Sequence, residues 1–129
     1  MRKFPIFDGH NDTLQMFYLP KRKRDASFFE KSEMGHIDYP RAQEGGFSGG
    51  LFSIFVPSQM ENHPRPGENL AGTQTSYELP MAPSVDLTRA QEITLKGTAN
   101  LFRLETASDG RIKVVRTVDE LEECLHRGI

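Results

Sequence analysis

Residues 6–12 of this chain read Ile-Phe-Asp-Gly-His-Asn-Asp, an apolar start followed by a histidine and a carboxylate two positions apart. If residues 3–12 are extended, the two-residue period of a strand places His10 and Asp12 on one face at its C-terminal end. A neutral imidazole and a carboxylate are good ligands for zinc or a related divalent ion, and parallel-barrel enzymes carry their chemistry at this end of their strands. The stretch therefore predicts a buried first strand that ends in a metal site.

Spacing alone does not decide the role of this pair. His-x-Asp also arises by chance, and an exposed histidine commonly just pairs with a nearby acid. The context favours the ligand interpretation, because the pair closes a short apolar strand near the N-terminus. In addition, Gly9 allows a turn or the close approach of another group.

Length and charge narrow the class of protein. The 129 residues suffice for one domain with a core, and the composition is that of a globular protein. A net charge of −2 argues against nucleic acid as a partner, because binding phosphates requires a clustered basic surface. The basic run at residues 21–24 is interpreted as a solvated loop, with a nuclear signal or an anionic contact as the alternative.

The expected compartment follows from cysteine usage and hydropathy. Cys124 is the single cysteine, so no internal disulfide can form, which fits a reducing environment. The N-terminus has basic residues but no apolar stretch of signal-peptide length, and no segment has the length and apolarity to span a bilayer. We therefore expect a cytoplasmic protein without a membrane partner.

Helical and extended patterns alternate along the rest of the chain. In its first half they predict a helix over 11–18 ended by Pro20, a helix from the N-cap Asp38 to Glu44, and a strand over 47–56 ended by Pro57. After a long loop over 58–85, they predict a helix from the N-cap Asp86 to a turn at 108–110, a short strand over 111–116, and a helix ending at Gly128. Thr117 and Glu120 form a capping box at the start of the last helix. Loops as long as 58–85 are usually lids, binding loops or disordered segments.

The order of these elements forms βα units, which predicts an α/β fold with parallel strand pairing. Ile129 follows a helix-ending glycine at the point where the next apolar strand should begin. A parallel sheet must be covered on both faces, and two main strands with three helices make a poor closed domain. We therefore expect residues 1–129 to be the N-terminal part, roughly half, of a truncated (β/α)8 TIM-like barrel, whose usual length is about 250 residues.

Three sequence blocks together resemble a known family. Residues 8–12 read DGHND, residues 36–46 read HIDYPRAQEGG and residues 49–57 read GGLFSIFVP. In this order they resemble the membrane (renal-type) dipeptidase family of the amidohydrolase superfamily. Many relatives in that superfamily carry His-x-His on the first strand, so His-x-Asp points to this branch.

The resemblance implies a distorted (β/α)8 barrel with two zinc ions that cleaves dipeptides and tolerates a D-residue at their C-terminal position. It also implies that His10 and Asp12 bind one of the two zinc ions. The other ligands of the family are a glutamate that bridges both metals, on the strand after the last helix predicted here, and two later histidines; this chain contains none of them. Because a catalytic zinc site needs about three protein ligands and an open position, we expect at most a partial site. The isolated chain is then expected to bind zinc weakly and not to turn over substrate.

A second His-x-Asp pair, His36 and Asp38, invites comparison with the first. Asp38 stands directly before Tyr39-Pro40, a position that favours helix capping over metal binding. The family does not use this pair as ligands, so we predict a structural role for it.

The remaining candidates are assigned lesser roles. Asp8 shares the strand face of His10, and it either orients a metal ligand from behind or forms a turn. His63 lies in a proline-rich loop and His126 among acids on a helix, so both are expected to be solvated.

Three hypotheses on function follow. The first is a zinc dipeptidase acting on a dipeptide substrate. The second is a non-catalytic fragment, favoured by the missing ligands and the open core. The third is a small binding module that self-associates as a homo-oligomer, since an uncovered sheet edge invites pairing.

Overall fold

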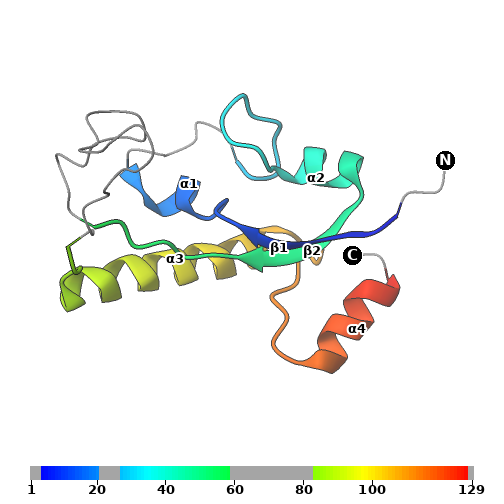
Figure 1. Cartoon of the computed structure of the whole chain (residues 1–129). Helices are drawn as coiled ribbons and strands as arrows, with labels where there is room; N and C mark the ends of the chain where they lie inside the picture. The colour runs from blue at the N-terminus through cyan, green and yellow to red at the C-terminus, as the bar shows by residue number, and fades with distance from the viewer. Residues whose placement is uncertain (1–3, 21–26, 59–82, 128–129) are drawn as a thin grey trace, which may run out of the picture.

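The computed structural model describes residues 4–20, 27–58 and 83–127. Strands and helices follow one another as β1 (Ile6–Asn11), α1 (Gln15–Tyr18), α2 (Tyr39–Gly45), β2 (Phe47–Phe52), α3 (Leu87–Ala107) and α4 (Val118–Arg127) (Figure 1). The long α3 runs along the strands and contacts α1, whereas α4 stands beyond the far end of α3 (Figure 1). The predicted loop over 58–85 falls mostly outside the described residues.

β1 and β2 form a parallel pair, which confirms the predicted strand pairing. The register aligns Ile6 with Phe47 at one end and Asn11 with Phe52 at the other, with two irregularities between them. Immediately after β2, the Ser53 amide donates to the Asn11 carbonyl at 2.8 Å. The carboxyl ends of both strands therefore lie side by side, and the residues that follow each strand meet at one edge.

Helix α2 begins and ends where the sequence predicts. The Asp38 side chain accepts a hydrogen bond from the Arg41 amide at 2.9 Å, as an N-cap does, and Pro40 stands in the first turn. Gly46 ends the helix in the left-handed conformation with a φ of 77°, which favours glycine. The chain therefore passes from α2 through Gly46 directly into β2.

Helix α3 is also capped as predicted, with the Asp86 carboxylate accepting from the Arg89 amide at 3.1 Å. At its middle the buried Gly97 lies against Ile54, so closely that a Cβ at this position would stand 2.8 Å from the Ile54 Cγ2. The helix ends at the predicted turn, where Asp109 and Gly110 have φ angles of 51° and 79°. The contact at Gly97 brings α3 against the chain that continues from β2.

The predicted strand over 111–116 is wrong, because these residues have no strand partner in the described part of the chain. Two of their backbone amides use carboxylate acceptors instead. The Val114 amide donates to the Glu105 Oε1 at 2.7 Å, and the Arg116 amide donates to the Glu120 Oε2 at 2.7 Å. The Glu120 amide donates to the Thr117 Oγ1 at 3.2 Å, which confirms Thr117 as the predicted cap. The Glu120 carboxylate reaches back as predicted, but to the Arg116 amide, one residue before the amide that a capping box uses.

Three other predicted elements are longer than those observed. The second strand ends at Phe52 and not at Val56, because the Tyr18 hydroxyl bonds both the amide and the carbonyl of Phe55, at 2.8 and 3.0 Å. The first strand begins at Ile6, and the first helix covers only Gln15–Tyr18.

The prediction that the strands are buried is also wrong. Ile6 and Phe7 on β1 are about half exposed, and Leu51 on β2 is 61% exposed. Among the described residues the buried large apolar side chains are Leu14, Phe28 and Ile93. Apolar sequence predicts burial only where another layer covers the strand, and here one face of the pair is largely uncovered.

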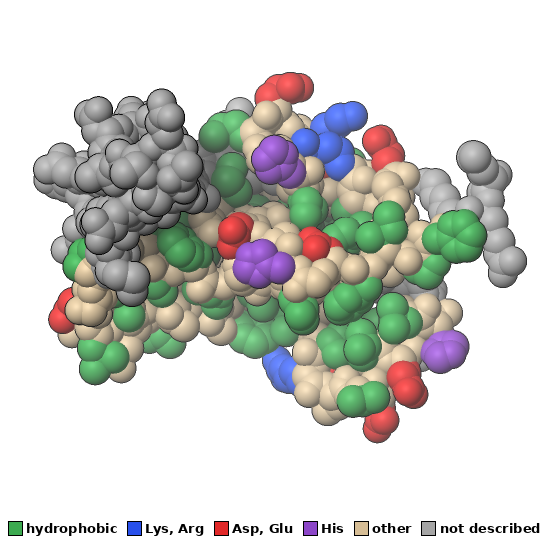
Figure 2. Space-filling model, viewed as in Figure 1, with side chains coloured by type: hydrophobic (Ala, Val, Ile, Leu, Met, Phe, Trp, Pro, Cys, Tyr) green, Lys and Arg blue, Asp and Glu red, His purple; other side chains and the backbone are tan. Residues whose placement is uncertain are grey.

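An apolar hollow of about 440 Å³ lies between the strands, α3 and α4. Its walls include Phe7, Phe47, Leu104 and Leu121, and Cys124 also lines it. Figure 2 shows hydrophobic side chains gathered on the surface between the strands and α4. The packing is therefore open between the strands and α4.

Candidate metal centre

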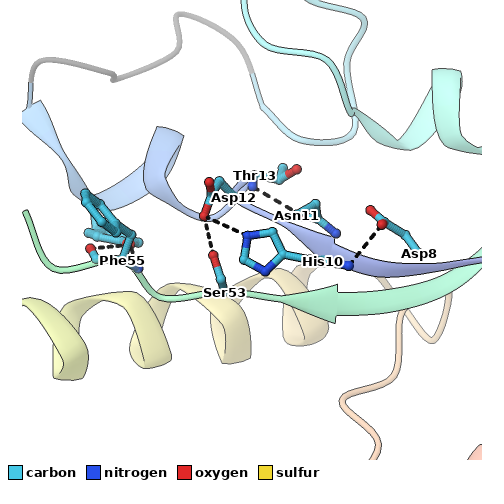
Figure 3. Close-up of polar contacts among 8 residues, drawn as sticks. Asp8, His10, Asn11, Asp12, Thr13, Ser53 and Phe55 are labelled. Atoms are coloured by element: carbon cyan, nitrogen blue, oxygen red, sulfur yellow. Dashed lines mark hydrogen bonds and ion pairs between the residues drawn. The ribbon is translucent and has the colours of Figure 1, made fainter. Parts of the chain in front are cut away.

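His10 and Asp12 lie at the C-terminal end of β1 and point toward each other (Figure 3). The His10 Nε2 is 3.7 Å from the Asp12 Oδ1, and the two side chains are 70% and 51% exposed. The predicted convergence of this pair is confirmed. Its role as a metal-ligand pair stays a prediction.

The separation of the two donor atoms fits a shared metal ion. Ligands that bind one zinc at about 2.1 Å lie roughly 3 to 4 Å apart at ordinary coordination angles. The 3.7 Å between the His10 Nε2 and the Asp12 Oδ1 falls in this range, and both atoms are accessible to solvent ions. The arrangement also allows an alternative to metal binding, a surface ion pair between Asp12 and a protonated His10.

Ser53 contributes a third polar group to this edge of the sheet. It follows β2 directly, and its hydroxyl donates a hydrogen bond to the Asp12 Oδ1 (Figure 3). Sequence reasoning missed this residue. Parallel pairing of the two predicted strands was the available signal, since it places the residue after the second strand beside the end of the first.

Local hydrogen bonds fix the backbone around the pair. The Asp8 Oδ1 accepts from the His10 amide at 3.1 Å, and the Asn11 Oδ1 accepts from the Thr13 amide at 3.2 Å. The Asp12 carbonyl then accepts from the Gln15 amide at 3.0 Å, which starts the turn into α1. Of the two roles considered for Asp8, the structure shows the local turn contact.

The second His-x-Asp pair is not a metal site. Asp38 is fully buried, and its Oδ2 accepts from the Arg41 Nε at 2.8 Å and from the Ser32 amide at 3.1 Å. Burial raises the pKa of Asp38, but these hydrogen bonds with Arg41 and Ser32 lower it, and the net pKa lies below its usual 3.8. The carboxylate is therefore ionised and fully engaged in capping α2, as predicted, while His36 is exposed.

No further ligand joins the His10 pair within the described part of the chain. Across residues 4–20, 27–58 and 83–127, no group of three or more His, Cys, Asp or Glu side chains is placed to hold a metal ion. His126 is exposed, with its Nδ1 2.7 Å from the Glu122 carbonyl oxygen. His63 lies outside the described residues. The described residues thus bring together two candidate ligands, His10 and Asp12.

Comparison with known proteins identifies the family. The sequence profile of the membrane dipeptidase family, peptidase family M19, matches residues 1–128. The chain belongs to this family. A protein of Acinetobacter calcoaceticus, described as an uncharacterized protein in the PQQ-III 3' region, is 42% identical over 65 residues, which are 48% of this chain and 21% of that protein.

Solved structures of this metallopeptidase family have the same α/β arrangement. Dipeptidase AC, a metallo peptidase of family M19, is 35% identical with a TM-score of 0.75, over 99% of this chain and 35% of that one. A metallo peptidase from Rhodobacter sphaeroides, liganded with a phosphinate mimic of the dipeptide L-Ala-D-Ala, is 34% identical with a TM-score of 0.77, over 99% of this chain and 36% of that one. The family member described here therefore spans about a third of the length of these structures.

None of the helices formed by the described residues is both long enough and apolar enough to cross a membrane.

Proposed function

We propose that this chain carries the first two metal ligands of a zinc-dependent dipeptidase, within the N-terminal part of a (β/α)8 barrel. The observation that carries the proposal is the His10 and Asp12 pair, exposed and 3.7 Å apart at the carboxyl end of β1. Membership of peptidase family M19 supports a peptidase role. The phosphinate mimic of L-Ala-D-Ala held by the Rhodobacter sphaeroides relative supports dipeptides, including those with a C-terminal D-residue, as substrates.

The residues of this chain would act by holding the metal. His10 would bind as the neutral imidazole and Asp12 as the carboxylate, so the binding of a dication is favoured by charge as well as by geometry. The chemistry that bound zinc supplies in such a site is activation of water and polarisation of the peptide carbonyl. The exposure of both side chains leaves room for a substrate and for further ligands at this edge.

Two ligands do not make a catalytic zinc site, which uses about three protein ligands and an open position. A complete centre would then require ligands beyond those that the described residues supply. We therefore expect the 129-residue chain on its own to bind zinc weakly and not to hydrolyse dipeptides.

Zinc affinity, measured by competition with a chromophoric chelator, tests the ligand assignment. His10→Ala and Asp12→Asn should each weaken binding at least tenfold, since each removes one of two ligands. His36→Ala is the matched control, because it alters the other His-x-Asp pair, whose Asp38 is engaged in capping. Unchanged affinity in His10→Ala and Asp12→Asn would refute the assignment.

Hydrolysis of L-Ala-D-Ala tests the second part of the proposal. The isolated chain with added zinc should show no turnover above the Asp12→Asn variant. Zinc-dependent hydrolysis that disappears in Asp12→Asn would show that this chain alone forms a working centre, and the requirement for outside ligands would be wrong.

A further inference from the structure

We propose that Ser53 is a positioning residue, which holds the Asp12 carboxylate in the orientation needed to share a metal ion with His10. The inference rests on the proposed function, because it assigns a role toward the same metal. Ser53 has no metal-ligating chemistry of its own in this assignment. Its effect is exerted through Asp12.

The hydrogen bond from Ser53 selects one oxygen of Asp12. Its hydroxyl donates to the Asp12 Oδ1, the same oxygen that faces the His10 Nε2 at 3.7 Å (Figure 3). A carboxylate has about four lone-pair sites on its two oxygens, so one bond from a hydroxyl leaves acceptor sites for a metal. The bond therefore restricts rotation of the carboxylate without consuming its capacity as a ligand.

The backbone holds Ser53 in place for this contact. Its amide donates to the Asn11 carbonyl at 2.8 Å, one residue before Asp12, so the two chain segments are tied together at this level. The next residue, Ile54, packs against Gly97 of α3. The backbone at Ser53 is thus held from both sides, by β1 through Asn11 and by α3 through Ile54.

Fixing a ligand in advance strengthens metal binding, because less conformational freedom is lost when the metal binds. Groups that hydrogen-bond metal ligands from outside typically change metal affinity about 10- to 100-fold when they are removed. Asp12 is half exposed and sits on a chain that turns directly into α1, so the loss of the Ser53 hydroxyl would remove one constraint on the rotation of its carboxylate. We expect the loss of the hydroxyl to fall within that range.

The alternative is that the Ser53 hydroxyl does not strengthen zinc binding. If Ser53 only satisfies Asp12 in the metal-free chain, zinc must compete with the hydroxyl, and removal of the hydroxyl should leave zinc affinity unchanged or raise it. The sign of the change in affinity therefore separates a positioning role from simple pairing.

The experiment measures zinc affinity by chelator competition, and the zinc-induced rise in melting temperature, for Ser53→Ala, Ser53→Thr and Ser48→Ala. Ser53→Ala should bind zinc about 10- to 100-fold more weakly and show a smaller thermal shift. Ser53→Thr retains the hydroxyl and should restore both values. Ser48→Ala is the control, because it removes a hydroxyl from β2 on the side of the hollow.

The outcomes distinguish this inference from the proposed function. If His10→Ala and Asp12→Asn weaken zinc binding but Ser53→Ala binds as well as the natural chain or better, the role of Ser53 is refuted and the metal site stands. If neither His10→Ala nor Asp12→Asn weakens binding, the proposed function fails first. If Ser53→Ala does not fold, Ser53→Val, which has the shape of Ser53→Thr but no hydroxyl, should show the same loss relative to Ser53→Thr.

Discussion

A methyl group added at Gly97 would collide with Ile54, and the Gly97→Ala variant measures how tightly α3 packs against the chain that follows β2. The added Cβ would stand 2.8 Å from the Ile54 Cγ2, 3.2 Å from its Cγ1 and 3.3 Å from its Cδ1. Both Cγ atoms are bonded directly to the Ile54 Cβ, so the side chain cannot swing both of them away at once. Relief requires a strained rotamer or a shift of the backbone.

Two opposing terms set the magnitude. Replacing glycine by alanine inside a helix stabilises it by about 1 kcal/mol through helix propensity. Inserting a methyl group into a packed contact typically destabilises by about 1 to 3 kcal/mol, and three short contacts place Gly97 in the upper part of that range. We therefore expect Gly97→Ala to lower the free energy of unfolding by about 1 to 2 kcal/mol.

Urea denaturation followed by far-ultraviolet circular dichroism would measure this difference. Gly45→Ala is the matched control, because Gly45 is also helical but has nothing within 4 Å of its would-be Cβ, and it should be neutral or stabilising. The double variant Gly97→Ala with Ile54→Ala should be less destabilised than the sum of its single variants, because it removes the colliding atoms. A Gly97→Ala variant as stable as the natural chain, or more stable, would refute the packing argument.

The remaining predictions concern the charged caps. Asp38→Ala should lower the free energy of unfolding by about 2 to 4 kcal/mol in the same urea assay, because α2 loses its cap and the Ser32 amide and the Arg41 guanidinium lose their acceptor. A loss below about 1 kcal/mol would contradict this role of the Asp38 carboxylate. Because the pKa of Asp38 is lowered in the folded chain, its stabilisation is complete above 3.8, the usual value, and is lost as the pH falls through the lower folded value. Urea midpoints measured across this acidic range should decline less steeply in Asp38→Asn than in the natural chain, and parallel curves would show that Asp38 is not the group responsible. The hydrogen bond from the Arg116 amide lowers the pKa of Glu120. Glu120→Gln should therefore also make the free energy of unfolding fall less steeply with acid, which again appears as a flatter curve of urea midpoint against pH.

Local features were predictable from the sequence, because their causes lie within a few residues. Asp38 and Asp86 cap helices through amides three residues ahead, and Thr117 accepts from the Glu120 amide in the same way. The His10 and Asp12 pair belongs to the same class, since the strand period alone brings the two side chains to one face.

Features that depend on distant partners were not predictable in this way. The segment over 111–116 has an alternating pattern, but a strand also needs a neighbour, and Glu105 and Glu120 take two of its amides instead. The apolar strand β1 predicts burial only if a layer covers it. Ser53 meets Asp12 across 41 positions of sequence, and only the register of the parallel pair reveals that contact.

The two-stranded sheet has a further consequence for when the metal binds. In the described part of the chain β1 pairs only with β2, so the outer edge of each strand has backbone groups available to another strand. If further metal ligands come from a strand that joins either edge, zinc binding and the addition of that strand are linked by a coupling free energy. By reciprocity, each would then strengthen the other by the same factor. The chain would then bind zinc weakly before the sheet is assembled and release it slowly afterwards, and the bound metal would stabilise the assembled sheet.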